Sequence, residues 1–175
     1  MSRTTKAQEL LDHANLTTVG LLVEAHAGLG ATLGHRLEVD HGLSGQRFEV
    51  LLRLMRSPDH RLRMSDLAAQ TTLSASGLTR VVDRLVASGL VERSTCPSDR
   101  RGSYAALTPE GATRILAAIP DHVAQISEIL ERTFTPHEID AFSAMLRRLR
   151  DAVNPEAERA SRTLDCEPVS ASPPG

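Results

Sequence analysis

Residues 64–111 read MSDLAAQTTLSASGLTRVVDRLVASGLVERSTCPSDRRGSYAALTPEG, and the pattern within them sets the fold class of the chain. Apolar residues at positions 78, 81, 82, 85 and 86 have the spacing of an amphipathic helix with one buried face. Ser74 can cap the start of this helix, and Ser88-Gly89 can end it. A shorter helix over residues 66–70, with Ser65 as its expected cap, is joined to it by residues 71–73. The pair has the form of a helix-turn-helix.

The segment that follows favours a β-hairpin. Residues 91–95 are β-prone, residues 96–103 are rich in turn formers, and residues 104–107 can return as the second strand. Thr108 and Pro109 can then cap and begin another helix. The expected hairpin carries Arg100 and Arg101 at its tip. The alternatives are an ordinary helical hairpin for the helix pair and a solvated loop for the two arginines.

A helix-turn-helix followed by an arginine-bearing hairpin is a winged helix-turn-helix, which binds double-stranded DNA. The second helix enters the major groove, and an arginine on a flexible arm can enter the minor groove. We expect Arg80 to make the main basic contact of that helix, to a base edge or a phosphate. The candidate DNA-binding residues are Ser65, Ser74, Ala75, Ser76, Thr79, Arg80, Arg84, Asp99, Arg100 and Arg101.

Residues 67–111 resemble the MarR family of bacterial transcription regulators. The pattern T-R-x-V-x-R-L-x-x-x-G-L-V-x-R lies at residues 79–93, the D-x-R of the wing at 99–101, and L-T-x-x-G at 107–111. Gly77 departs from the family, which more often has a side chain there. The resemblance implies a mainly α, six-helix protomer with a small two-stranded antiparallel wing at about residues 91–107. It also implies a dimer joined by the first and last helices, and an Asp99 that orients Arg101 towards the minor groove.

Composition narrows the class of protein. The 175 residues are 41% hydrophobic and 24% charged, typical of a soluble globular chain. Only 2% are aromatic and none is Trp, which argues against recognition of single strands or RNA by base stacking. The net charge of −2 requires a local basic face for DNA binding. We find no apolar run long enough to span a membrane and no signal sequence, so we expect a cytoplasmic protein with no membrane partner.

The chain divides into five expected parts. A disordered start at residues 1–6 precedes N-terminal helices for dimerisation and support at 7–58, with a break or kink favoured by glycines 20, 28, 30 and 34. The DNA-binding module covers residues 59–108. C-terminal helices follow at 109–154, with a kink at Pro120 and a capping box at residues 135–138. Residues 155–175 form a disordered tail. Wide apolar stripes on the outer helices predict a symmetric homodimer on a palindromic site.

Catalytic and cofactor motifs are absent. There is no phosphate-binding Gly loop, no H-E-x-x-H and no G-x-S-x-G, so we expect no enzymatic activity and no cofactor. A metal site assembled from Glu24, His41 and His122 is one alternative, against surface or capping histidines. Cys96 could sense oxidants if Arg93 or Arg101 lowered its pKa, against a spectator thiol. Cys96 and Cys166 are the only cysteines, which fits a reducing compartment.

Two functions of different kinds fit these observations. The first is a sequence-specific regulator of transcription, most simply a repressor that binds a palindromic operator as a homodimer and is released by a small-molecule effector. The second is a winged-helix module that binds proteins and no longer reads DNA. A metal- or redox-responsive form of the regulator is a variant of the first.

Overall fold

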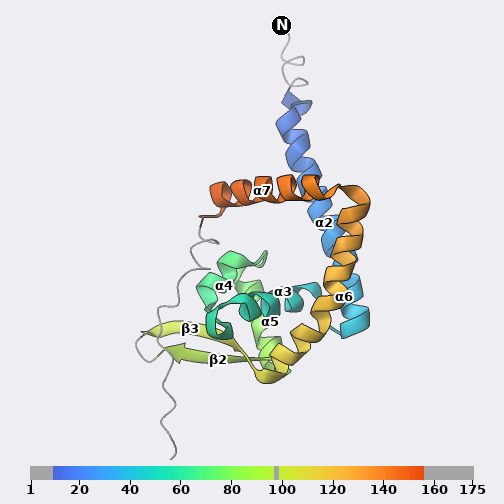
Figure 1. Ribbon diagram of the computed structural model, residues 1–175. Coiled ribbons are helices and arrows are strands. Elements are labelled where there is room, and N and C mark those ends of the chain that lie inside the picture. The colour runs from blue at the N-terminus through green and yellow to red at the C-terminus, as the bar shows by residue number, and fades with distance from the viewer. Residues whose placement is uncertain (1–9, 97–98, 156–175) are drawn as a thin grey trace, which may run out of the picture. The chain divides into compact units, whose positions relative to one another are not determined.

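The computed structural model describes residues 10–96 and 99–155, and at residues 95, 96 and 99–102 it describes the backbone alone (Figure 1). The ends predicted to be disordered, residues 1–6 and 155–175, lie outside the described residues except for Pro155, and Cys166 lies outside them as well. The chain separates into two compact units, residues 1–45 and 46–175. The second unit therefore contains the winged module and both C-terminal helices.

The first unit is built on α2, Ala14–His41, a continuous helix of 28 residues. His13 caps its start, because the His13 Nδ1 accepts a hydrogen bond from the backbone N–H of Asn15 at 3.2 Å. Gly42 ends it in a left-handed conformation with φ 62°. The predicted break at the glycines is wrong, since the interruption lies at residues 12–13. A single glycine costs a helix interior only about 1 kcal/mol, too little to interrupt it by itself.

Helix α2 also corrects the expectation that no apolar run could span a membrane. It is long and apolar enough by composition, since its best window has a mean hydropathy of 1.3. Leu37 is its one buried residue. A helix that packs against a protein partner passes the same test, so this helix alone is weak evidence for a membrane segment.

The second unit begins with α3, Gly45–Arg56, which has the predicted bounds and buries Phe48, Val50, Leu51 and Leu54. A short 3-10 turn, η1 (Pro58–His60), and a strand, β1 (Arg61–Arg63), lead into α4, Met64–Gln70. Helix α4 starts two residues earlier than predicted, with Arg63 as its N-cap. Ser65 therefore lies in its first turn and is not the cap. Pairing of β1 with β3 holds the backbone extended up to Arg63, which fixes where the helix can begin.

The second helix of the pair is α5, Ala75–Ala87, with Ser74 as its N-cap as predicted. Leu78, Val81, Val82 and Leu85 are buried, which confirms the apolar stripe. Val86 lies at the edge of the stripe and stays 38% exposed, so its predicted burial is wrong. Gly89 follows the helix in a left-handed conformation with φ 73°.

The sheet has three strands in the order β1-β3-β2, all antiparallel, of which Figure 1 labels β2 and β3. Strands β2, Val91–Cys96, and β3, Asp99–Leu107, form the predicted wing. The strands are longer than predicted and the turn is shorter, so residues 99–101 belong to β3 and not to a loop at the tip. The register shifts between Thr95, which pairs with Ser103, and Cys96, which pairs with Asp99. Strand β1 was not predicted, because three residues carry too little pattern.

Two long helices complete the unit. Helix α6, Pro109–Thr133, runs through Pro120 as one element, as expected, and Thr108 caps it by accepting from the N–H of Gly111 at 3.0 Å. Helix α7, Pro136–Val153, starts at the predicted capping box of residues 135–138 and has no buried residue. Just after α7, the Nδ2 of Asn154 donates to the carbonyl of Ala69 in α4 at 3.1 Å.

Candidate nucleic-acid interface

The start of α5 is held by the side chain of Ser74. Its Oγ accepts from the N–H of Gly77 at 3.1 Å and lies 3.3 Å from the Oγ of Ser76. A Cβ at position 77 would come within 3.2 Å of the same Oγ. Glycine at this position therefore leaves the capping hydroxyl room, which accounts for the departure from the family pattern. Ala75, the first residue of the helix, and Ser76 are both exposed.

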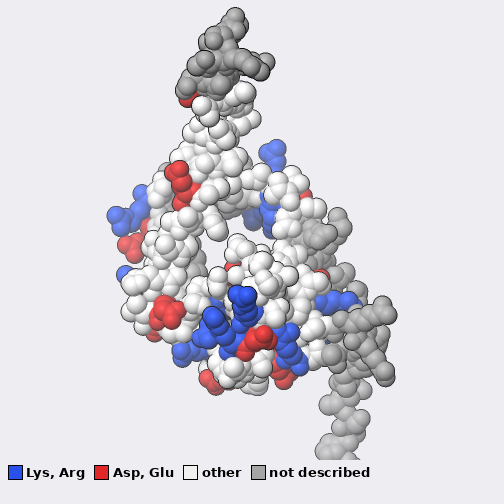
Figure 2. Space-filling model, turned by 180° about the vertical axis from the view of Figure 1, so that it is seen from behind, with Lys and Arg blue, Asp and Glu red and all other residues white. Residues whose placement is uncertain are grey.

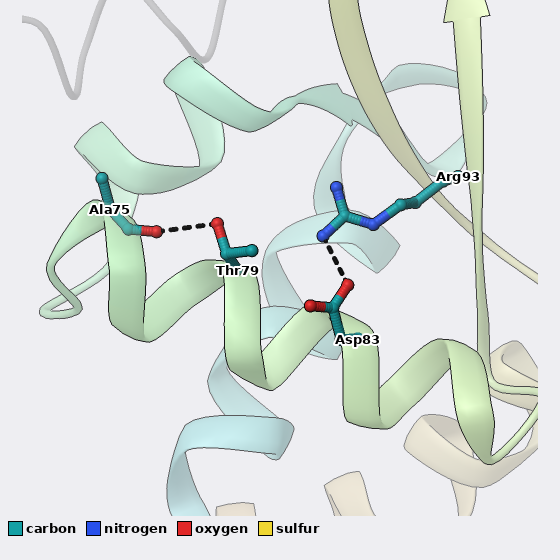
Figure 3. A network of polar contacts seen from close by, with 4 residues as sticks. All are labelled: Ala75, Thr79, Asp83 and Arg93. Atoms are coloured by element: carbon teal, nitrogen blue, oxygen red, sulfur yellow. Dashed lines mark hydrogen bonds and ion pairs between the residues drawn. The ribbon is translucent and has the colours of Figure 1, made fainter.

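The outer face of α5 presents Thr79, Arg80 and Arg84, all exposed. The Thr79 hydroxyl donates to the carbonyl of Ala75 at 3.0 Å (Figure 3), so its oxygen is left to act as an acceptor. Within the described part of the chain, the guanidinium groups of Arg80 and Arg84 make no hydrogen bond or ion pair. Both are therefore available to phosphate or base edges.

An ion pair that the sequence did not predict joins the wing to this helix. The Nη2 of Arg93 in β2 donates to the Oδ1 of Asp83 in α5 at 2.8 Å (Figure 3). The two side chains are 33% and 59% exposed, so the pair contributes little to stability, about 0–1 kcal/mol. It links the side chain of a residue in β2 to one in α5. Arg93, which was suggested as a residue that could lower the pKa of Cys96, is therefore paired with Asp83.

The turn of the helix-turn-helix is held from α3 by a second contact that was not predicted. The carboxylate of Glu49 accepts from the backbone N–H and from the Oγ1 of Thr72, both at 3.3 Å. These bonds tie the connection between α4 and α5 to α3. No local motif marks Glu49, because its partner lies 23 residues away in the sequence.

The basic side chains are concentrated locally. Figure 2 shows Lys and Arg side chains gathered around an acidic one in the region where Figure 1 places α5 and the start of the wing. In this region α5 supplies the exposed Arg80 and Arg84, and the Asp83–Arg93 pair lies beside them. A chain of net charge −2 thus carries the local positive face that DNA binding requires.

The wing is described in part. The side chains of Asp99, Arg100, Arg101 and Cys96 lie outside the described residues, so their predicted roles stay predictions. At the root of the wing, two guanidinium groups of β1 lie near the ring of the buried Tyr104. The Cζ atoms of Arg61 and Arg63 are 5.1 and 5.4 Å from the ring centroid, within the range of cation–π attraction.

The structure does not bring the suggested metal ligands together. Glu24 and His41 lie on the same helix, 17 positions apart, a separation of about 25 Å along its axis. His122 instead contacts the ring of Phe48, with the centroids 4.4 Å apart, and burial lowers the pKa of His122. Among the described residues, no group of three or more His, Cys, Asp or Glu side chains is placed to hold a metal ion. The proposed triad is therefore wrong.

This chain is similar to known bacterial transcription regulators. A family model described as MarR family matches residues 41–102. Two relatives come from Bacillus subtilis (strain 168). The HTH-type transcriptional repressor YetL is 33% identical over 60% of this chain and 62% of its own length, so the match spans less than two thirds of that repressor. The HTH-type transcriptional regulator MhqR is 31% identical over 62% of this chain and 73% of its own.

A solved structure extends the likeness over most of the fold. The crystal structure of Sco3205, a MarR family transcriptional regulator from Streptomyces coelicolor in complex with DNA, is 31% identical to this chain. The match has a TM-score of 0.72 and covers 80% of this chain and 88% of Sco3205.

Proposed function

Because the chain belongs to the MarR family of transcription regulators, we propose that it is a repressor that binds a palindromic operator as a homodimer and is released by a small-molecule effector. The observation that carries the DNA-binding part is the outer face of α5, where exposed hydroxyls and two unengaged arginines lie together. We also propose that the protein acts in the cytoplasm, where a bacterial operator is found.

The roles of the interface residues follow from their places. At the start of α5, Ser74 and Ser76 lie beside backbone N–H groups that favour a phosphate. Arg80, one turn further on, is the side chain proposed to reach a base edge, and Arg84 is proposed to bind phosphate. In the wing, Arg101 is proposed to enter the minor groove, aimed by Asp99, while Arg100 follows the DNA backbone.

The homodimer is supported by apolar side chains that the chain leaves uncovered. In α7, which has no buried residue, Met145 and Leu149 are 56% and 46% exposed. Leu116 and Val123 in α6 are each about half exposed. Burial of such side chains against a second copy would stabilise them by about 25 cal/mol per Å² of apolar surface. A dimer of these helices presents two α5 helices to successive major grooves, which is what a palindromic site requires.

Release by an effector is supported by the contact between Asn154 and Ala69. This hydrogen bond joins the segment after α7 to α4, the first helix of the DNA-binding pair. A ligand that moves α7 relative to α4 would therefore move the recognition helix as well.

The test begins with an operator. Genomic fragments bound by the purified protein are sequenced, and the enriched site is used for affinity measurements. Arg80→Ala is expected to lose about 1–3 kcal/mol on this site and much less on random DNA if Arg80 reads a base. Arg132→Ala, an exposed arginine of α6 paired with Glu128, removes the same charge and serves as the control. Equal losses on both DNAs would leave Arg80 only a phosphate contact.

The competing function makes a different prediction. A module that binds proteins and no longer reads DNA would enrich no fragment, and Arg80→Ala would change nothing. The remaining parts are checked by a solution mass of twice the 18.9 kDa chain and by a footprint with two-fold symmetry. Repression is checked by raised expression of the target genes in cells that lack the protein.

A further inference from the structure

A cavity of about 120 Å³ lies in the second unit, between the end of α3, the strand β1 and the end of α4, and no residue of α5 lines it. It is lined by Arg53, Arg56, Ser57, Pro58, Leu62 and Gln70. A cavity of roughly 150 Å³ in another protein holds benzene, so this volume suits a molecule of a few heavy atoms. None of these residues is among the candidate DNA-binding residues, and none lies in α6 or α7, the helices proposed to form the dimer.

The cavity is electrostatically positive. Arg53 and Arg56 are three positions apart on α3 and so lie on the same side of the helix. The Nε of Arg53 is buried and has no hydrogen-bond partner among the described residues. Burial lowers the pKa of the Arg53 guanidinium, and the positive charges of Arg56 and Arg150 lower this pKa further. The negative charge of Glu49 acts in the opposite direction and raises the pKa of Arg53. The charge of Glu49 therefore offsets part of the positive charge of the two arginines, and its carboxylate also accepts hydrogen bonds from Thr72.

The other lining groups indicate what kind of anion would fit. The Ser57 hydroxyl already donates to the carbonyl of Leu54 at 2.7 Å, so it offers an acceptor and not a donor. The Gln70 amide can donate. Pro58 and the buried Leu62 form an apolar wall. A guanidinium pair beside an apolar wall suits a carboxylate with a short hydrocarbon body better than a phosphate, which has no apolar part.

We propose that this cavity binds a small organic carboxylate, held by Arg53 and Arg56, and that binding lowers the affinity for the operator. The proposal rests on the proposed function, since it names a site and a chemical class for the effector. Gln70 carries the effect, because it is the last residue of α4 and is followed by the turn into α5. A ligand that draws Gln70 towards the arginines changes the position of α4 relative to the recognition helix.

Binding is tested first, without DNA. Butyrate is titrated into the full chain and followed by NMR, with butyramide as the uncharged analogue, sodium chloride as the ionic-strength control and phosphate as the second anion. We expect saturable binding of butyrate at about millimolar concentration, weaker binding of phosphate and none of butyramide. Arg53→Met keeps the aliphatic packing and removes the charge, so its affinity for butyrate should fall at least about 10-fold, a typical loss for a charge-assisted contact.

A matched variant separates this role from a structural one. Arg47→Gln removes one positive charge from the same helix outside the cavity lining and should bind butyrate as the wild type does. If Arg53 served only to stabilise the end of α3, Arg53→Met would melt at a lower temperature. Because Arg53 is partly buried with an unpartnered Nε, we expect the melting temperature to stay the same or rise.

The operator completes the test. Saturating butyrate should weaken operator binding by the wild type and by Arg47→Gln, and should leave operator binding by Arg53→Met unchanged. Butyrate binding that does not depend on Arg53, or no binding at all, overturns the site. Binding that leaves operator affinity unchanged overturns the coupling. A wild type that enriches no operator without butyrate counts against the proposed function, whatever the binding experiment shows.

Discussion

Gly111 is the position where the structure makes its most quantitative prediction. This residue lies in the first turn of α6 and is buried against the end of the α5–β2 connection. A Cβ built on Gly111 would overlap the carbonyl oxygen of Leu90 and lie 3.0 Å from the Cδ2 of Leu107. The Leu107 side chain can move aside, but the Leu90 carbonyl is backbone. It also accepts from the N–H of Thr108 at 3.2 Å, so moving it breaks that bond.

The size of the effect of Gly111→Ala follows from three contributions. Alanine favours the helix by about 1 kcal/mol relative to glycine. Overpacking against a fixed group costs about 1–3 kcal/mol, and the lost Thr108–Leu90 bond costs about 1 kcal/mol more. The expected net loss in the free energy of unfolding is therefore about 2 kcal/mol. For a chain of this length the melting temperature should fall by about 4–8 °C.

The assay is thermal unfolding followed by circular dichroism, with operator affinity measured below the transition. The control is Gly30→Ala in α2, where an added Cβ meets nothing within 4 Å and the helix should gain up to about 1 kcal/mol. Operator affinity should fall in Gly111→Ala and stay unchanged in the control, because the wing is displaced from α5 only in the former. A Gly111→Ala protein that melts at or above the wild-type temperature would refute the reasoning.

Three further predictions concern single contacts. Burial lowers the pKa of His122 below its ordinary 6.5, so between these values the unfolded chain binds a proton that the folded chain does not. Stability should therefore fall as the pH drops through this window, and His122→Leu should flatten the dependence in urea titrations at pH 5–7. In a double-mutant cycle, Asp83→Ala and Arg93→Ala should couple by about 0.2–1 kcal/mol in stability, and a larger coupling in operator binding would show that the pair aims the wing. The N–H and hydroxyl of Thr135 lower the pKa of Glu138, so the stabilisation by the capping box should be present above pH 4.5 and be lost as the pH falls through the lowered pKa. A Glu138→Gln protein that keeps the wild-type acid dependence would contradict this last assignment.

Much of the fold could be predicted because its signals are local. The bounds of α3, the Ser74 cap, the Thr108 cap and the capping box of α7 each depend on residues within four positions of one another. The start of α4 and strand β1 could not be predicted in this way. Both depend on pairing between residues 61–63 and 104–106, about 40 positions apart, and three residues show no usable alternation.

The DNA-binding site was also predictable only where its signals are local in the sequence. The residues of the recognition helix could be named from periodicity and from the family resemblance, since they lie on one face of one helix. The contacts that hold this helix in place, Asp83 to Arg93 and Glu49 to Thr72, join separate elements and leave no mark in the sequence. The metal triad failed for a related reason, because spacing along the chain does not report that Glu24 and His41 are on one continuous helix.

Tyr104, which lies close to the guanidinium groups of Arg61 and Arg63, gives the wing its own fluorescence signal. It is the one tyrosine of the chain, and the chain has no tryptophan. At wavelengths that excite tyrosine but not the three phenylalanines, emission from the unlabelled protein therefore comes from a single place, the root of the wing in β3. A change in this emission on adding DNA would report on the sheet itself and on its arginine neighbours. The same property means that unfolding of α2 or α7 alone leaves the emission unchanged, so those helices need a far-ultraviolet signal to be followed.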